Sequence, residues 1–443
     1  MRILNYNTML LPSAGYDNAQ RASLIARADF MAGHDVVVLE ELFDNSASDA
    51  LLKGLHDRGY VYQTPVIGRN SPDWDEPHHS ESLEDGGVAI VSRHRITYKA
   101  EAEFPEGCGW DHESAKGFAY ARIVVGGANV HVFGTHPQAD TAQGEGLYPC
   151  GGSAVGYKTA RQIRLGQLRQ MNAYIAAKER SGMVPGGDMV VVAGDINVDR
   201  HGDEYRDMLG ALSLTAPDAS LGWPYSYDTH NNTIGRIRDG DKVGQTPIPS
   251  RPQDLDHVLP REGHARPARW NSRVLTGTYP WQTTYWTTWW AYTDYSDHYP
   301  IVAGPGVGES AGTYSLTVDR VELTEVGEDA CGGRKIDAFG RMTVQGADGS
   351  PRVLWSRTED ESTVKHKGDT FPLTSVVTKS AHGFAINVDV MDDDWVFCGG
   401  GNDNAPYGTV WWNNEDGVGQ HSKTLVGPET ESELRVTYTV NAG

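Results

Sequence analysis

The first 305 residues alternate between short apolar runs and longer amphipathic segments, and this alternation restricts the fold more than any other feature. Two amphipathic segments, residues 19–32 and 159–178, place apolar side chains at helical spacing. Because some strand-like runs follow one another directly and others are separated by helices, we predict layered α/β with mixed sheets covered by helices. The β-branched runs typical of buried strands are residues 36–39, 88–91, 123–125, 130–133 and 189–192.

A glycine-rich break at residues 304–312 follows the last of these runs. A chain of 443 residues is long enough for two cores, so we place a domain boundary there and expect domains at 1–305 and 312–443. Beyond the break, apolar and polar residues alternate with strand period and no long helical pattern occurs. We therefore predict a C-terminal all-β sandwich. The alternating apolar residues are Tyr314, Leu316, Val318, Leu434, Val436, Tyr438 and Val440.

The chain carries a formal net charge of −21 at pH 7. Nucleic-acid binding without sequence reading needs a basic surface that displaces counterions from phosphates. We therefore expect no nucleic-acid partner, although a bound divalent cation would reverse the sign of the charge locally. Nothing in the sequence implies a protein partner.

The cysteines bear on the cellular compartment in which the protein works. The sequence has no run of about 18 apolar residues, the length that a membrane-spanning helix needs. Cys108, Cys150, Cys331 and Cys398 fall two in each expected domain, without zinc-ligand spacing. Two disulfides in the mature form of a secreted protein fit best. Four free, buried thiols in a cytosolic protein are the alternative.

Polar residues stand at the ends of the apolar runs, where a side chain can leave the sheet edge and reach a cleft. No single one is decisive, because Asn and Asp favour turns by themselves and a lone histidine at a strand end is more often structural. As a set they indicate one site: Asn7, Glu40, Glu41, His136, Asp195, Asn197, Asp256, Asp297 and His298.

This set has the chemistry of a metal-assisted hydrolase. Carboxylate and amide oxygens are the ligands of a hard cation, so we expect Mg²⁺ or another divalent cation. A histidine beside a buried carboxylate can activate water, because the carboxylate fixes the imidazole tautomer and stabilises the imidazolium. His298 with Asp256 fits that role.

Five motifs resemble those of the endonuclease/exonuclease/phosphatase superfamily, and within it the bacterial sphingomyelinase C family. They are Asn7, Glu41-Leu-Phe-Asp-Asn45, Gly134-Thr-His-Pro-Gln138, Gly194-Asp-Ile-Asn197 and Tyr295-Ser-Asp-His-Tyr-Pro300. The resemblance covers residues 1–305 and implies a four-layer α/β sandwich there. The C-terminal sandwich lies outside it.

The resemblance also implies a mechanism, in which Glu41, in preference to Glu40, holds Mg²⁺ together with Asn7. His298 would deprotonate the attacking water. The other roles so implied are that Asp256 orients the base, Asp195 positions the nucleophile, Asn197 and His136 hydrogen-bond the transition state, and Asp297 supports metal or water.

Two further features are implied by the resemblance: a second cation site at Asn45, Glu84 and Asp85, and a disulfide between Cys108 and Cys150. Carboxylates solvated in a turn explain Glu84 and Asp85 equally well.

Residues 279–295 are rich in Trp and Tyr directly before the motif that contains His298. Such rings favour the membrane interface, and in the resembled family a hairpin in this place binds the bilayer. We expect Trp286, Trp289 and Trp290 to be exposed there, although strand alternation puts Trp289 and Trp290 on opposite faces. Burial in strand pairs or a core is the alternative.

The substrate implied by the resemblance is sphingomyelin, cleaved to ceramide and phosphocholine at a phospholipid surface. His257 and Tyr6 stand where the family commonly has Tyr and His, so a glycerophospholipid, as for a phospholipase C, stays open. A secreted nuclease or phosphatase of the same superfamily is the runner-up.

For residues 312–443 two roles stay open, a lipid- or carbohydrate-binding accessory domain and a passive stabilising domain. The acidic run Asp392–Asp394 would bind Ca²⁺ if it lay in a loop; solvated surface is the alternative. The pair Trp411 and Trp412 would contact a ligand if exposed, and would fill a core otherwise.

Overall fold

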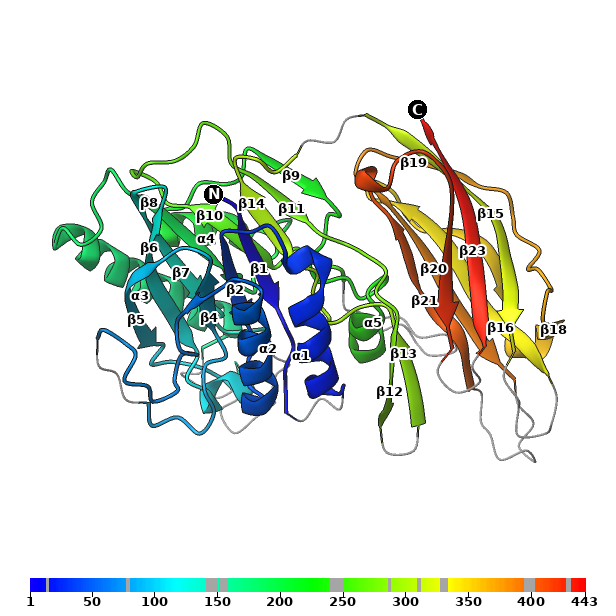
Figure 1. Cartoon of the computed structure of the whole chain (residues 1–443), viewed down its shortest axis with the longest axis horizontal. Coiled ribbons are helices and arrows are strands. Elements are labelled where there is room, and N and C mark those ends of the chain that lie inside the picture. The colour runs from blue at the N-terminus through cyan, green and yellow to red at the C-terminus, as the bar shows by residue number, and fades with distance from the viewer. Residues whose placement is uncertain are drawn as a thin grey trace. The chain divides into compact units, whose positions relative to one another are not determined.

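Figure 1 shows the computed structural model of the chain. It describes residues 1–12, 16–76, 80–140, 150, 158–239, 251–285, 288–308, 312–326, 334–393, 403–427 and 432–443. The chain forms two compact units: Met1–Ser220 with Gln253–Leu275 and His298–Gly308, and Leu221–Pro252 with Thr276–Asp297 and Glu309–Gly443. The domain boundary expected at 305–312 stays a prediction, and the second unit takes in two segments that precede it. Among the described helices, none is long and apolar enough to cross a membrane.

The first unit is built on two mixed sheets that pack face to face, with β1 and β2 of one sheet against β8 of the other. The first sheet has the strand order β3 (Tyr62–Gln63), β4 (Ala89–Ser92), β2 (Val36–Glu40), β1 (Ile3–Asn7), β14 (Ile301–Gly304), β11 (Asn271–Val274) and β9 (Ala219–Gly222). Its parallel pair is β1 with β2, whereas β14 runs antiparallel to β1.

The second sheet of this unit has the order β10 (Asp256–Pro260), β8 (Met189–Asp195), β7 (Ala128–Thr135), β6 (Gly117–Val125) and β5 (Ile96–Glu103). Here β7 and β8 are parallel, and β10 is antiparallel to β8. Both sheets are therefore mixed, as predicted.

Helices form the two outer layers (Figure 1). Helices α1 (Asn18–Arg27) and α2 (Asn45–Asp57) pack against each other on one side. On the other, α3 (Ala160–Arg180) and α4 (Glu204–Leu212) share an apolar core with the second sheet. This confirms the layered α/β prediction. The predicted helix 159–178 begins at a capping box made by Thr159 and Gln162, whereas the predicted helix 19–32 is too long, because Ala28 adopts an extended conformation.

The second unit contains a β-hairpin, a short helix and an antiparallel β-sandwich. The hairpin joins β12 (Trp281–Tyr285) to β13 (Thr288–Tyr292), and the helix is α5 (Thr233–Asp239). One sheet of the sandwich has the order β19 (Val377–Ser380), β15 (Tyr314–Glu325), β23 (Glu433–Ala442) and β22 (Gly419–Val426). The other has the order β17 (Arg352–Arg357), β16 (Lys335–Gly346), β20 (Phe384–Asp392) and β21 (Asp403–Trp412), with β18 (Thr363–His366) also paired to β16.

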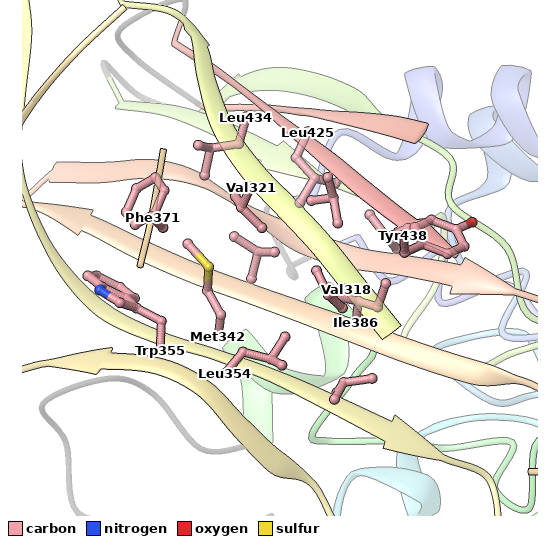
Figure 2. Packing of buried hydrophobic residues seen from close by; sticks show 14 of the residues in the cluster. Val318, Val321, Met342, Leu354, Trp355, Phe371, Ile386, Leu425, Leu434 and Tyr438 are labelled. Atoms are coloured by element: carbon pink, nitrogen blue, oxygen red, sulfur yellow. The ribbon is translucent and has the colours of Figure 1, made fainter. Parts of the chain in front are cut away.

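The core of the sandwich lies between its two sheets (Figure 2). Leu434 and Tyr438 from β23 are fully buried, as are Met342 from β16 and Ile386 from β20. Burying an aliphatic side chain of this size stabilises the fold by about 1.5–3 kcal/mol. The strand alternation therefore predicted both the sandwich and its inward-facing residues.

Candidate active site

Most of the expected site residues meet at one edge of the two sheets. Asn7, Glu40 and Asp195 are the last residues of β1, β2 and β8, and Asp256 begins β10 directly opposite Asp195. Because β1 is parallel to β2 and β7 to β8, their carboxyl ends point the same way. The side chains so brought together are Asn7, Glu41, His136, Asp195, Asn197, Asp256 and His298.

His298 and Asp256 form a buried pair. Nδ1 of the imidazole lies 2.7 Å from Oδ2 of Asp256, and Asp256 is fully buried. The amide of Asn5 donates to Oδ1 of the same carboxylate at 3.1 Å, so Asp256 is held on both oxygens. Nε2 of His298 lies 3.7 Å from Oδ2 of Asp195. The imidazole is thus anchored on one nitrogen and presents the other to the cluster around Asp195.

His136 lies at the centre of this cluster. Its Nε2 is 3.5 Å from Oδ2 of Asp195, 4.0 Å from Oε1 of Glu41 and 3.3 Å from Nζ of Lys116. Burial, with Lys116 and His298, lowers the pKa of His136 well below its usual range. The imidazole is therefore neutral at pH 7, and its Nδ1 has no hydrogen-bond partner among the described residues.

Asp195 is fixed by two asparagines. Asn7 donates from Nδ2 to Oδ2 at 2.9 Å, and the backbone N–H of Asn197 donates to Oδ1 at 3.0 Å. Asn197 and Glu41 both have a left-handed backbone, each with φ 56°. Such conformations are costly for non-glycine residues and persist where the surroundings enforce them, often at functional sites.

The donor set at this edge fits a divalent cation. Glu41, His136 and Asp195 each offer a ligand atom, and these atoms lie within 4.8 Å of one another. Asp195, Asp256 and His298 form a second such group. Carboxylate oxygens predominate, and their close approach is electrostatically unfavourable without positive charge. A hard cation that prefers oxygen ligands, such as Mg²⁺, satisfies both conditions.

Lys116 and Asn5 belong to the site but were not found from the sequence. Lys116 is buried and pairs with Asp111 at 2.7 Å, in addition to its contact with His136. It lies between β5 and β6, outside any recognisable motif. Asn5 donates to Oε2 of Glu40 at 3.2 Å as well as to Asp256. The two-residue period of a strand could have indicated Asn5, because this residue lies on the same strand face as Asn7.

Glu40 is buried behind the site, and its pKa is raised well above the usual range by burial and by Asp256 and Asp195. Asp297, the residue before His298, forms an ion pair of 2.5 Å with Arg238. Its expected role in supporting metal or water therefore stays a prediction.

The residues expected to form a second cation site have other contacts. Asp85 pairs with Arg69 at 2.6 Å and accepts the N–H of Gly87 at 2.9 Å. Glu84 forms an isolated bridge with Ser114, and Asn45 is the first residue of α2. In the described part of the chain, Glu84 and Asp85 belong to no close group of three His, Cys, Asp or Glu ligands.

The aromatic segment forms the β12–β13 hairpin. Trp281 is buried, packs against Tyr292 in a tilted arrangement with ring centroids 4.8 Å apart, and donates from Nε1 to the carbonyl of Asp294. Trp290 is partly buried and lies opposite Thr283. Trp286 lies outside the described residues, as does the side chain of Trp289, so their expected exposure stays a prediction.

The disulfide implied between Cys108 and Cys150 is formed. Cys331, Cys398 and Asp394 lie outside the described residues. Of the other acidic residues considered for Ca²⁺, Asp392 accepts the N–H of Asp337 at 2.7 Å, and Asp393 accepts the hydroxyl of Ser362 at 3.3 Å. Trp411 and Trp412 are both buried, which agrees with the core alternative.

Comparison with known proteins identifies the family to which the chain belongs. Residues 16–298 match the endonuclease/exonuclease/phosphatase family. The sphingomyelinase C of Listeria ivanovii is 36% identical, over 68% of this chain and 85% of its own length. A phospholipase C of Staphylococcus aureus is 34% identical, over 68% of this chain and 86% of its own length.

Solved structures agree. The sphingomyelinase C from Streptomyces griseocarneus superposes with a TM-score of 0.61 at 40% identity, covering 69% of this chain and 98% of its own. A beta toxin mutant from Staphylococcus aureus with bound magnesium ions gives a TM-score of 0.61 at 32% identity, covering 68% and 98%. The chain therefore belongs to the endonuclease/exonuclease/phosphatase family, among the bacterial sphingomyelinases C, and is a phosphoric diester hydrolase.

Proposed function

We propose that the chain is a Mg²⁺-dependent phospholipid phosphodiesterase that hydrolyses sphingomyelin to ceramide and phosphocholine. The observation that carries the proposal is the buried pair of His298 and Asp256 beside the cluster of Glu41, His136 and Asp195. A water-activating base and a cation-binding carboxylate group at one sheet edge are the two parts that metal-assisted phosphodiester hydrolysis needs.

In the proposed reaction, Nε2 of His298 takes a proton from the attacking water, because Nδ1 is held by Asp256. The carboxylate of Asp256 stabilises the imidazolium that forms. Asp195, whose Oδ2 lies 3.7 Å from Nε2 of His298, orients the water for attack on phosphorus. The bond from phosphorus to the ceramide oxygen breaks, that oxygen takes up a proton from water, and the imidazolium of His298 returns its proton to solvent.

Fixed side chains of the site stabilise the negative charge that develops on the transferring phosphoryl group. Lys116 supplies a buried positive charge and donates to Nε2 of neutral His136, while the amide of Asn197 supplies a further hydrogen-bond donor. Glu41 and Asn7 would hold Mg²⁺, which when bound polarises a phosphoryl oxygen and offsets the charge of the carboxylates.

The assignment to lipid is supported by the relatives named sphingomyelinase C and phospholipase C, and by the aromatic hairpin. The relative named phospholipase C makes a glycerophospholipid the second candidate substrate. The beta toxin structure with bound magnesium ions supports Mg²⁺ as the cofactor. A formed disulfide supports secretion, since disulfides persist in oxidising compartments.

A substrate panel tests the proposal. Vesicles of sphingomyelin, phosphatidylcholine or phosphatidylethanolamine, and supercoiled plasmid, are incubated separately with the full chain and Mg²⁺. We expect phosphocholine release from sphingomyelin, none with His298→Ala, and unchanged release with the exposed-residue control His201→Ala. Plasmid nicking without release from any lipid would refute the proposed substrate class.

A further inference from the structure

The residues on either side of the β12–β13 hairpin are bonded to the sandwich strand β21, which lies at the edge of its sheet. Before the hairpin, the hydroxyl of Thr278 donates to the carbonyl of Thr409 at 3.1 Å and accepts the N–H of Trp411 at 2.9 Å. After it, the hydroxyl of Thr293 accepts the N–H of Thr409 at 3.2 Å. Backbone groups of the strand edge are thus satisfied by hairpin-flanking side chains.

The hairpin itself is also attached. Gln282 in β12 donates from Nε2 to the carbonyl of Gly427, directly after β22, at 2.8 Å. Its partner in the hairpin register, Ala291, is buried. Asn413, directly after β21, donates to the carbonyl of Thr276, which precedes the hairpin, at 2.9 Å. The contacts therefore reach two turns of the sandwich as well as the strand edge.

Packing at this contact is as close as in a domain core. Gly408 has φ +148°, and a Cβ there would lie 2.6 Å from Cγ2 of Thr293. Both Thr293 and Thr409 are buried. Buried polar groups at such a contact resist separation, because each would be left without its partner.

We propose that the C-terminal sandwich holds the β12–β13 hairpin in the orientation in which the hairpin binds a phospholipid surface. This inference rests on the proposed function, which supplies the lipid substrate. The sandwich would then contribute to hydrolysis in a bilayer and not to the chemical step, because the contacts described above are made to the hairpin and its flanks. With a formal net charge of −21, the chain suits a zwitterionic phosphocholine surface bound by aromatic rings.

The test removes three of these hydrogen bonds with little change in volume, in the variant Thr278→Val/Gln282→Leu. Matched controls carry the same replacements elsewhere in the sandwich, Thr363→Val in β18 and Gln420→Leu in β22. Three quantities are measured on the full chain: binding to sphingomyelin vesicles in EDTA, turnover of those vesicles with Mg²⁺, and turnover of the water-soluble ester p-nitrophenylphosphocholine.

We expect vesicle binding and vesicle turnover to fall about tenfold in the double variant, while turnover of the soluble ester stays within about twofold. Unchanged vesicle binding would overturn the proposal, as would an equal loss on the soluble ester. If the wild type hydrolyses no phosphocholine ester, the proposed function fails, and binding in EDTA still decides the role of the sandwich. If the double variant does not fold, Gln282→Leu alone carries the same comparison.

Discussion

Asp294 is a buried carboxyl whose ionisation should set part of the pH dependence of stability. Its Oδ2 accepts the N–H of Thr233 at 2.8 Å and the hydroxyls of Thr233 and Thr293 at 2.7 and 3.3 Å. Burial nevertheless dominates and raises the pKa of Asp294 from 3.8 to about 7. The carboxyl is therefore neutral in the folded chain at mildly acidic pH.

The direction in which stability changes with pH depends on how many protons the folded and unfolded states bind. Between pH 3.8 and about 7 the folded state holds a proton on Asp294 that the unfolded state has released, so the free energy of unfolding falls as pH rises through this window. Relative to a carboxyl whose pKa does not change on folding, Asp294 lowers the free energy of unfolding by about 2 kcal/mol at pH 5 and by about 4 kcal/mol at pH 8. Asp294→Asn removes the titration while keeping one acceptor oxygen for the two threonines.

Urea unfolding at pH 5 and pH 8 measures the effect. From pH 5 to pH 8 we expect the wild type to lose about 2–3 kcal/mol more stability than Asp294→Asn does. The control Asp348→Asn changes an exposed turn residue and should follow the wild type. Equal pH dependence in the wild type and Asp294→Asn would show that burial does not raise this pKa.

Three further outcomes are expected. Asp256→Asn should lower kcat about 10³–10⁴-fold with the fold intact, as judged by circular dichroism, because the amide cannot stabilise the imidazolium; a loss below tenfold would contradict the pairing. Reducing the disulfide between Cys108 and Cys150, which are 42 residues apart, should lower stability by about 4 kcal/mol in denaturant titrations, and an unchanged midpoint would contradict this. Gly194→Ala should destabilise by about 3 kcal/mol or more, since a Cβ would lie 1.9 Å from the carbonyl oxygen of Thr135; wild-type stability by thermal unfolding would disprove that contact.

The sequence predicted the elements whose signals are local. Strand alternation at Leu434, Val436 and Tyr438 predicted the sandwich and its inward face, because a half-buried strand must alternate. Polar residues such as Asp195 at strand ends predicted the site, because carboxyl ends of parallel strands share an edge.

Features that depend on distant contacts left no comparable signal. Lys116 reaches His136 from a connection between strands, and neither spacing nor composition marks it. The hydrogen bond from Thr278 to Thr409 joins residues 131 positions apart, and no periodicity in the sequence indicates such a pairing. The helix end at Ala28 depends on one backbone conformation within an otherwise helical pattern.

The central claim is that the cluster at this sheet edge binds the cation that phosphodiester hydrolysis requires. The most direct test is to strip the enzyme with EDTA and titrate Mg²⁺ while following phosphocholine release from sphingomyelin vesicles, in the wild type and in Glu41→Gln. We predict that activity returns with Mg²⁺ and that Glu41→Gln needs at least about tenfold more Mg²⁺ for half-maximal release. Full activity in EDTA, or the same half-saturation in both proteins, would contradict the account.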